Sequence, residues 1–484
     1  MRKGGDRMNK QKITYALLSA AFLGSAALFP AFASDSTIAG NGAFANNQIQ
    51  STSQNTVKTT QTNNTQATNT VSVNNNTGNN SANFNTGATV VVQTGNSNAN
   101  VGISNTAGSN TAQVAQTAPA SPNSTVLSNG AFSNNSTQSN TANTTALEQT
   151  NTTNLANTVN VSNNTGNNAA NYNTNSNVAI GTGDANATVG ISNTAGSNQA
   201  AVVDPSNGWQ NGSNAFVAGN GAFSNNNVAE NSNANTSLDQ TNNSNLINNV
   251  TENNNTGNNS ENYNTGGSVG IFTGNANAYV GIENSAGQNT AFIYGGDGMN
   301  QTPDAYILDN GAFSASNVTG WNSFRTDLKQ QNLTYVLNYV DTMNNTGNNA
   351  ASFNTGGSTV LVTGDANAGV TSFNTAGSND GYIIGGPVYA NAAENDILGN
   401  GAFSYNNVTE SQNNNTYENQ NNETMFDNTV NENNNSGNNQ SNYGNSYLSP
   451  YMMYGNYGMN EMQSGDSNSF TGLYNLASAN YLSY

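Results

Sequence analysis

The sequence predicts an all-β protein, a β-solenoid built from five repeats of about 90 residues, each made of short stacked rungs, with the fifth repeat truncated. Three observations predict this fold: a tetrapeptide that recurs at nearly constant spacing, turn glycines at fixed distances inside each repeat, and short apolar bursts between these glycines. The chain has no cysteine. Hydrogen bonding and stacking must therefore stabilise the fold in place of disulfides.

A leader peptide is expected at residues 1–33. Basic residues between Arg2 and Lys12 precede an apolar run from Ile13 to Phe29, and Ala31-Phe32-Ala33 has the small-x-small pattern of a signal-peptidase site. The alternative is a retained membrane anchor, which the short run and the cleavage pattern disfavour. We therefore expect a secreted or cell-surface protein that meets the membrane only through the cleaved leader.

The charge balance after residue 33 excludes several classes of partner. Lys58, Arg325 and Lys329 stand against 25 acidic residues, a formal charge of −22. Three scattered cations cannot form a phosphate-binding surface, so nucleic acid is excluded as a partner. The chain has no histidine, and its acidic residues do not recur as a placed carboxylate pair. An enzyme is therefore not expected.

Each repeat opens with Asn-Gly-Ala-Phe, and the glycine of this tetrapeptide recurs after 88, 91, 90 and 90 residues. These glycines are Gly42, Gly130, Gly221, Gly311 and Gly401. The resulting units are residues 34–128, 129–219, 220–309 and 310–399, a partial repeat at 400–446, and a Tyr- and Met-rich tail at 447–484. The tail is expected either to cap the last rung or to act as an adhesive segment for assembly.

Further landmarks keep their distances inside each repeat. A glutamine follows the first glycine after 19 residues: Gln61, Gln149, Gln240, Gln330 and Gln420. The glycine of an Asn-(Thr/Ser)-Gly-Asn-Asn turn follows 17 residues later: Gly78, Gly166, Gly257, Gly347 and Gly437. A Thr-Gly-(Asn/Asp) turn and an Ala-Gly turn come next, and all variation in length lies in the last stretch, which also holds Pro119, Pro122, Pro205, Pro303 and Pro387. Because proline cannot donate to a β-ladder, the stretches without it are expected to be paired strands.

Short apolar bursts indicate the strands themselves. Triplets such as Val101-Gly102-Ile103 and Val189-Gly190-Ile191 alternate as a half-buried strand does. About five such rungs per repeat predict more than twenty rungs and a rod on the order of 100 Å long. Asparagine suits this stack, because its side-chain amide can hydrogen-bond to the asparagine directly above and below it.

The rung pattern resembles the curlin repeat of bacterial functional-amyloid fibres, Gln-x-Gly-x-x-Asn-x-Ala-x-x-x-Gln. The segment Gln93–Asn98 matches its first half, Gln149–Asn160 matches with asparagine replacing the glycine and the final glutamine, and Gly108–Gln116 matches its second half with one residue deleted. Most rungs lack the flanking glutamine, and the long repeat is larger than a simple curlin array. The resemblance implies self-association into extracellular fibres.

Two recurring features are candidates for binding. The third position of the Thr-Gly-(Asn/Asp) turn includes Asp184 and Asp365, which are candidate calcium ligands, while the alternative is that the side chain only caps its own turn. The phenylalanine of Asn-Gly-Ala-Phe is expected to plug the end of the core, with a ligand-stacking platform as the alternative. No other cofactor is expected, and Asn-x-(Ser/Thr) sequons leave attached glycans open.

The sequence as a whole predicts a secreted structural protein that forms or decorates an extracellular fibre, sheath or biofilm matrix. Exposed rung edges at the two ends of the stack are expected to drive head-to-tail addition. The alternative is a monomeric surface adhesin, or an ice- or carbohydrate-binding rod that uses a flat face of repeated Thr and Asn.

Overall fold

The computed structural model describes residues 35–115, 123–203, 214–294, 304–384, 395–443, 460–477 and 479–483. Every regular element in these ranges is a β-strand, which confirms the all-β class, and no helix in them could span a bilayer. The predicted leader, the prolines named above and residues 444–459 of the tail region lie outside the described residues.

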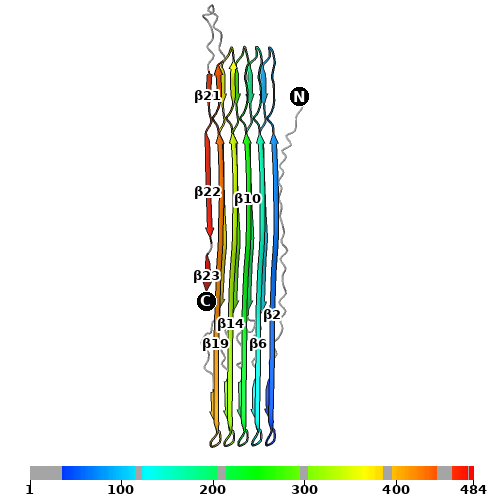
Figure 1. Cartoon of the computed structure of the whole chain (residues 1–484), viewed down its shortest axis with the longest axis vertical. Helices are drawn as coiled ribbons and strands as arrows, with labels where there is room; N and C mark the ends of the chain where they lie inside the picture. The colour runs from blue at the N-terminus through cyan, green and yellow to red at the C-terminus, as the bar shows by residue number, and fades with distance from the viewer. Residues whose placement is uncertain are drawn as a thin grey trace, which may run out of the picture.

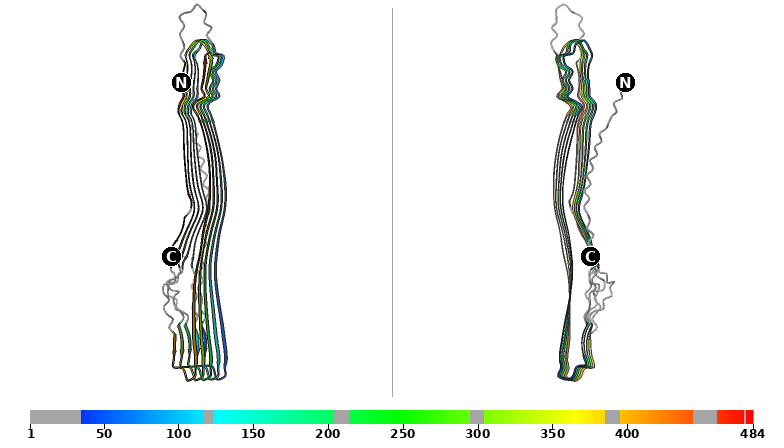
Figure 2. Two further views of the ribbon diagram at one scale, coloured as in Figure 1. Left: turned by 60° about the vertical axis from the view of Figure 1, so that its left-hand side comes forward. Right: turned by 90° about the vertical axis from the view of Figure 1, so that its right-hand side faces the viewer.

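Each repeat forms one elongated coil of the solenoid (Figure 1). Coil 1 consists of β1 (Ser36–Ala39), β2 (Asn46–Asn76), β3 (Val90–Gln93) and β4 (Ser97–Ala115). The long strands β2 and β4 face each other across a narrow core, as the contact between Val71 and the cluster around Val101 shows. Figure 2 shows the same two layers in all the coils, joined by turns at the tips.

The five coils stack in parallel and in register. The strands of coil 2 are β5 (Ser124–Leu127), β6 (Asn134–Asn164), β7 (Val178–Gly181) and β8 (Ala185–Val203). Those of coil 3 are β9 (Asn214–Ala218), β10 (Asn225–Asn255), β11 (Val269–Phe272) and β12 (Ala276–Tyr294). Those of coil 4 are β13 (Asp304–Leu308), β14 (Ala315–Asn345), β15 (Ala350–Asn354), β16 (Thr359–Val362) and β17 (Ala366–Ile384). Those of coil 5 are β18 (Asn395–Leu398), β19 (Tyr405–Asn435), β20 (Gln440–Tyr443), β21 (Asn460–Gln463), β22 (Ser467–Ala477) and β23 (Asn480–Ser483).

The predicted solenoid of five repeats is confirmed, but its rung is much longer than predicted. Each residue pairs with its equivalent in the next repeat, as in Asn63↔Asn151↔Asn242, so one repeat makes one rung and the stack has five. The 31 residues of β2 extend roughly 100 Å along the strand, whereas five coils stack to roughly 24 Å. The long dimension therefore follows the strands and not the stack, and the predicted rod of more than twenty rungs is wrong.

The polar stretches explain this difference. Apolar bursts mark only part of each strand, because the Asn-, Thr- and Ser-rich residues between them also alternate between the inside and the outside of the coil. Because their side-chain amides hydrogen-bond along the stack, such polar residues can be buried without leaving unsatisfied donors or acceptors. A pattern that counts only apolar residues therefore divides one long strand into several short ones.

The predicted Ala-Gly turns are kinks within strands that recur at the same place in each of coils 1 to 4. Gly108, Gly196, Gly287 and Gly377 have φ angles of 68°, 65°, 69° and 69°, yet each lies inside the long strand β4, β8, β12 or β17. Two neighbouring residues, Ala107 and Gly108, are both buried at this point, so the alternation shifts by one residue. The glycine provides the left-handed conformation that this shift of the alternation needs, and the strand continues without turning.

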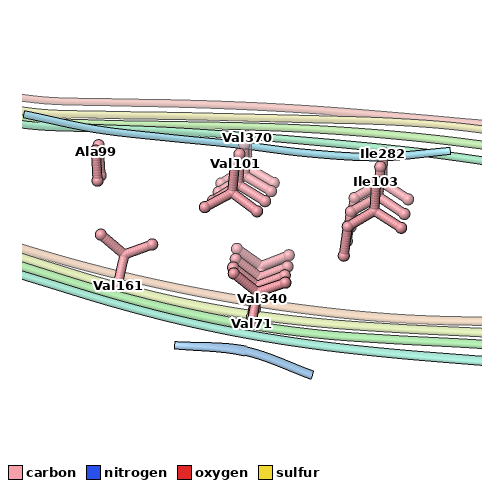
Figure 3. Packing of buried hydrophobic residues seen from close by; sticks show 14 residues of the cluster. Val71, Ala99, Val101, Ile103, Val161, Ile282, Val340 and Val370 are labelled. Atoms are coloured by element: carbon pink, nitrogen blue, oxygen red, sulfur yellow. The ribbon is translucent and has the colours of Figure 1, made fainter. Parts of the chain in front are cut away.

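The core consists of apolar clusters separated by polar layers. Figure 3 shows Val71, Val161 and Val340 of one layer facing Ala99, Val101 and Ile103 of the other. Leu155, Ala195 and Leu246 form another cluster farther along the same two layers. Between these two clusters lies a layer of buried asparagines that includes Asn157 and Asn193.

The tail completes the fifth coil. Strands β21 and β22 pair in parallel with β16 and β17 at an offset of 101 residues, and β23 also pairs with β17. The repeat predicted as truncated at residue 446 therefore regains its register at Asn460. The signal for this was present in Ser464-Gly465-Asp466, a copy of the Thr-Gly-(Asn/Asp) turn that lies 28 instead of 17 residues after Gly437.

Candidate functional site: the two open ends of the stack

Hydrogen-bonded ladders of identical side chains run through the whole stack. Asn63, Asn151, Asn242, Asn332 and Asn422 form one ladder, with Nδ2 to Oδ1 distances of 3.0, 3.0, 2.8 and 2.8 Å. The predicted repeat glutamines, Gln61, Gln149, Gln240, Gln330 and Gln420, form another, with Nε2 to Oε1 distances of 2.7, 2.9, 2.8 and 2.7 Å. The asparagine ladders expected from the composition are thus present, with a step of one whole repeat.

The inward amides also join the two layers of a coil. Asn157 donates one Nδ2 hydrogen to Oδ1 of Asn248 in the next coil at 2.8 Å, and the other to Oδ1 of Asn193 in the facing strand at 3.1 Å. Its own Oδ1 accepts from Asn69 and Asn105 at 2.8 and 3.0 Å. Such an amide uses all four of its hydrogen-bonding positions, which is what its complete burial requires.

These ladders have a direction. In every step of the Asn63 ladder the donor belongs to the coil nearer the N-terminus and the acceptor to the next coil, whereas in the glutamine ladder the later coil donates. The asparagine ladder of Asn69 ends at Asn428, whose one hydrogen bond as a donor is to Asn475 at 3.2 Å. Among the described residues its second N–H has no acceptor, and the Oδ1 of Asn69 has no donor. At this position of the ladder the last coil therefore has an unused donor and the first coil an unused acceptor.

The strands at both ends of the stack are unpaired on one side among the described residues. In the two long sheets β2 and β4 form one edge, and β19 and β22 form the other. Inward side chains of β2, such as Asn69, are only partly buried, although the equivalent Asn157 is fully buried in coil 2. We call the surface formed by β1–β4 the N-terminal end face and the surface formed by β18–β23 the C-terminal end face.

The tetrapeptide phenylalanines form an exposed ladder, which corrects the prediction that they plug the core. Neighbouring rings lie 4.9, 4.9, 5.0 and 5.1 Å apart with their planes within 14° of parallel, and they are Phe44, Phe132, Phe223, Phe313 and Phe403. Each has a φ angle between 56° and 63°, so the turn aims its ring outward. Interior rings are covered on both faces by their neighbours, which leaves no free face for a stacking ligand.

The rings at the ends of this ladder are different. Phe44 is 76% exposed and Phe403 is 82% exposed, against 50% for Phe132. Each terminal ring has one face without a stacking neighbour among the described residues. A second ladder, at the opposite tip of the coil, contains Phe84, Tyr172, Tyr263 and Phe353 at centroid distances of 5.0 Å.

The candidate calcium residues take part in a backbone ladder. The Oδ1 of Asp184 accepts the N–H of Asn275 at 2.9 Å, and the Oδ1 of Asp365 accepts the N–H of Asp466 at 2.9 Å. Asp184 is separated from Asp365 by the neutral Asn275 of coil 3. Within the described ranges no three His, Cys, Asp or Glu side chains come together as a metal site. This arrangement favours the structural role of the turn, with the side chain capping the next coil.

Most of the predicted repeat glycines lie close to the backbone of a neighbouring coil. A Cβ on Gly130 would meet backbone atoms of Ala43 and Gly42 within 2.8 Å. A Cβ on Gly257 would contact the carbonyl oxygen of Gly347 in the next coil. The turns that contain these two sets of glycines can therefore stack at the strand spacing only if no side chain is present.

Inward carboxylates are the residues that sequence reasoning missed. Glu252 and Glu261 of coil 3 are fully buried, and among the described residues the carboxylate oxygens of Glu252 have no hydrogen-bond partner. Burial raises the pKa of Glu252 to about 8, and burial also raises the pKa of Glu261 well above its usual range. The alternation of inward and outward side chains along the strand would have placed Glu252 inside, because it occupies the inward position held by Val161 and Thr342 in the neighbouring coils.

A comparison of the chain with protein-family models, with curated proteins and with solved structures finds no match.

Proposed function

We propose that this chain is a secreted structural protein that polymerises head to tail into an extracellular fibre, sheath or matrix, in the manner of curlin-like proteins. The observation that carries the proposal is the pair of end faces, which hold complementary ends of the same ladders. Placing coil 1 of one copy on coil 5 of another continues the pattern of each coil on the next. This contact is heterologous and does not close on itself, so it generates an open filament.

The end residues match in type as well as in polarity. Asn428 on the C-terminal end face offers an N–H to the Oδ1 of Asn69 of a second copy. Phe403 and Phe44 offer the two open ring faces. The unpaired backbone edges of β19 and β2, each 31 residues long, supply the largest number of hydrogen bonds. Identical ladders that continue across a junction are the basis of cross-β stability.

The extracellular setting follows from the sequence. The leader expected at residues 1–33 and the absence of cysteine fit a protein that leaves the cell and depends on stacking for its stability. The acidic side chains keep single copies soluble before they assemble.

A second candidate function, a carbohydrate-binding surface protein, is favoured by one groove. This groove, of about 810 Å³, crosses all five coils beside the end of the long strands. It is lined almost entirely by asparagine side chains, among them Asn76, Asn164, Asn255, Asn345 and Asn435. An uncharged lining of amide donors and acceptors suits a neutral hydroxylated ligand such as a glycan.

Electron microscopy of residues 34–484 diluted from denaturant tests the main proposal. We expect unbranched fibres with a cross-β spacing of about 4.8 Å along the fibre, each copy adding roughly 24 Å of length. Monodisperse particles roughly 100 Å long that never elongate, and that bind glycans saturably, would favour the second candidate.

A matched pair of variants localises the growing end. Ser53 points inward on the N-terminal end face, whereas the neighbouring Thr52 points outward and is exposed. We expect Ser53→Arg to block growth, because a charge at an inward position prevents the next coil from seating, and Thr52→Arg to leave growth intact. Equal growth of both variants would show that the N-terminal end face is not the junction.

A further inference from the structure

The C-terminal end face carries three carboxylates at inward positions. Glu410, Glu418 and Glu432 are in register with Gly320, Leu328 and Thr342 of coil 4, which are buried positions. In coil 5 the three glutamates are half-buried, because no further coil covers them among the described residues. They are spread along β19, so they do not form a cation site and each meets its own position on an incoming coil.

The N-terminal end face offers these carboxylates no counter-charge. Continuing the register places Ser51, Thr59 and Val73 of a second copy over Glu410, Glu418 and Glu432. None of the inward residues of β1, β2, β3 or β4 is charged. The three cations of the described chain, Lys58, Arg325 and Lys329, lie at outward positions.

Within the same copy, Glu410 and Glu432 each accept a hydrogen bond from a neutral side chain. Thr471 donates its hydroxyl to Glu432 at 3.1 Å, and Asn395 donates to Glu410 at 3.4 Å. Burial raises the pKa of Glu410, and the nearby carboxylate of Asp304 adds to this shift. Glu418 follows the inward leucines Leu238 and Leu328 in its ladder.

Coil 3 shows what happens to a carboxylate that lies between two coils. Glu252 belongs to the same ladder as Glu432 and lies between Val161 and Thr342, where it is fully buried. Glu230 belongs to the ladder of Glu410 and is 4% exposed. A carboxyl group in such surroundings is far more easily buried in its neutral form.

We infer that the junction between two copies is proton-dependent: it forms when Glu410, Glu418 and Glu432 are protonated and weakens as they ionise. The inference rests on the proposed function, because it takes a second copy of the chain as the partner of the C-terminal end face. Association buries the three groups between coils and thereby favours the protonated form. Protonation in turn favours association, by linkage.

The composition of the chain permits a clean test. With no histidine and no cysteine, no side chain of ordinary pKa titrates between about pH 6 and about pH 8.5. The side chains that titrate in this range are carboxyl groups buried between coils, and they include Glu252 inside each copy, whose pKa is raised to about 8 by burial. Variants that all keep Glu252 therefore isolate the effect of the junction glutamates. Seeded elongation of the full chain after removal of the leader, followed by light scattering and electron microscopy, measures the junction directly.

We expect wild-type elongation to slow about tenfold or more between about pH 6 and about pH 8.5. The variant E410Q/E432Q should lose most of this dependence and elongate rapidly at the higher pH. The matched control E423Q/D427N removes two charges from outward, exposed positions of the same strand, and it should keep the wild-type dependence. Circular dichroism of each variant before seeding verifies that the monomer is folded.

Three other outcomes would overturn the inference. Equal wild-type rates at both pH values would remove the proton dependence while leaving head-to-tail assembly intact. If the control E423Q/D427N also lost the pH dependence of elongation, overall charge would be its cause. The absence of fibres at any pH would contradict the proposed function itself, and the inference with it.

Discussion

At the scale of single residues, the unusual feature is a core that holds carboxylates without cations. Glu252 is fully buried in the central coil, and its pKa is raised to about 8 from an ordinary value of 4.5. The folded chain therefore binds this proton more tightly than the unfolded chain does. The associated stability is fully present below about pH 4.5 and is lost as the pH rises towards 8.

Replacing Glu252 by valine, the residue that coil 2 has at this position, should remove this loss. A pKa difference of this size corresponds to about 5 kcal/mol, so we expect Glu252→Val to unfold at a higher temperature than wild type at about pH 8 and to show little difference below about pH 4.5. Thermal unfolding by circular dichroism in the Ser53→Arg background, which is expected to stay monomeric, measures this. The control Glu283→Gln, on the outward face of coil 3, should behave as wild type at both pH values.

At the scale of the strands, stability depends on amides that are bonded in two directions. Asn248 accepts from Asn157 and Asn193 and donates to Asn284 and Asn338, all within 3.2 Å. Strict alternation along the 31-residue strands keeps such residues inside over their whole length. The composition alone suggested these ladders, but not that they join the two facing layers.

We expect Asn248→Ala to destabilise the monomer by about 2–4 kcal/mol, because it leaves four neighbouring amides without one partner each. The adjacent Asn249 points outward and is exposed, so Asn249→Ala should change the free energy of unfolding by less than about 0.5 kcal/mol. Chemical unfolding of both variants measures the difference. Similar losses for the two variants would mean that the buried ladders contribute no more than surface asparagines.

The turns at the tips of the strands allow a second comparison. A Cβ on Gly257 contacts the carbonyl oxygen of Gly347, whereas a Cβ on Gly281 finds its nearest atom, the hydroxyl of Thr371, at 3.8 Å. We therefore expect Gly257→Ala to prevent close stacking of coils 3 and 4 and to lower the unfolding midpoint clearly. Gly281→Ala should be neutral or slightly stabilising. A neutral Gly257→Ala variant would show that the turns adapt to a side chain.

At the scale of the whole molecule, the polymer depends on complete end faces. Coil 5 is formed by two parts of the chain, residues 395–443 and the strands β21, β22 and β23 of the tail. The tail was expected either to cap the stack or to be an adhesive segment, and in the structure it supplies a strand edge equivalent to that of every other coil. Among the described residues, no strand pairs with the outer edge of β19 or β22, so the described part of the tail does not cap the stack.

Two truncated chains compare a complete C-terminal end face with an incomplete one. A chain ending at residue 446 lacks β21, β22 and β23 and should elongate at least tenfold more slowly, because the edge of β17 and the edge of β19 then lie at different heights. A chain ending at residue 384 has four complete coils and should elongate normally. It should also do so independently of pH, because Gly320, Leu328 and Thr342 replace the three glutamates. Seeded growth of both truncations, compared by electron microscopy, tests these expectations.

The sequence by itself determined the five repeats, their register, the all-β class and the ladders of Asn and Gln. These properties follow from period and residue type, since identical side chains at a fixed spacing align when the repeats stack. It did not reveal the length of the rung, because polar residues are as deeply buried as apolar ones once their amides are paired. Nor did it show that Phe44 and its equivalents lie outside.

Only the tertiary structure decided which residues meet across the coil and which are left at the ends. The bond between Asn157 and Asn193, the burial of Glu252 and the return of the tail to register all depend on the facing strand or the neighbouring coil. Whether a side chain is satisfied is a property of its partners, and these lie about 90 residues away along the chain or on the opposite strand of the same coil. The two open end faces, from which the proposed function derives, exist only because the stack has a first coil and a last one.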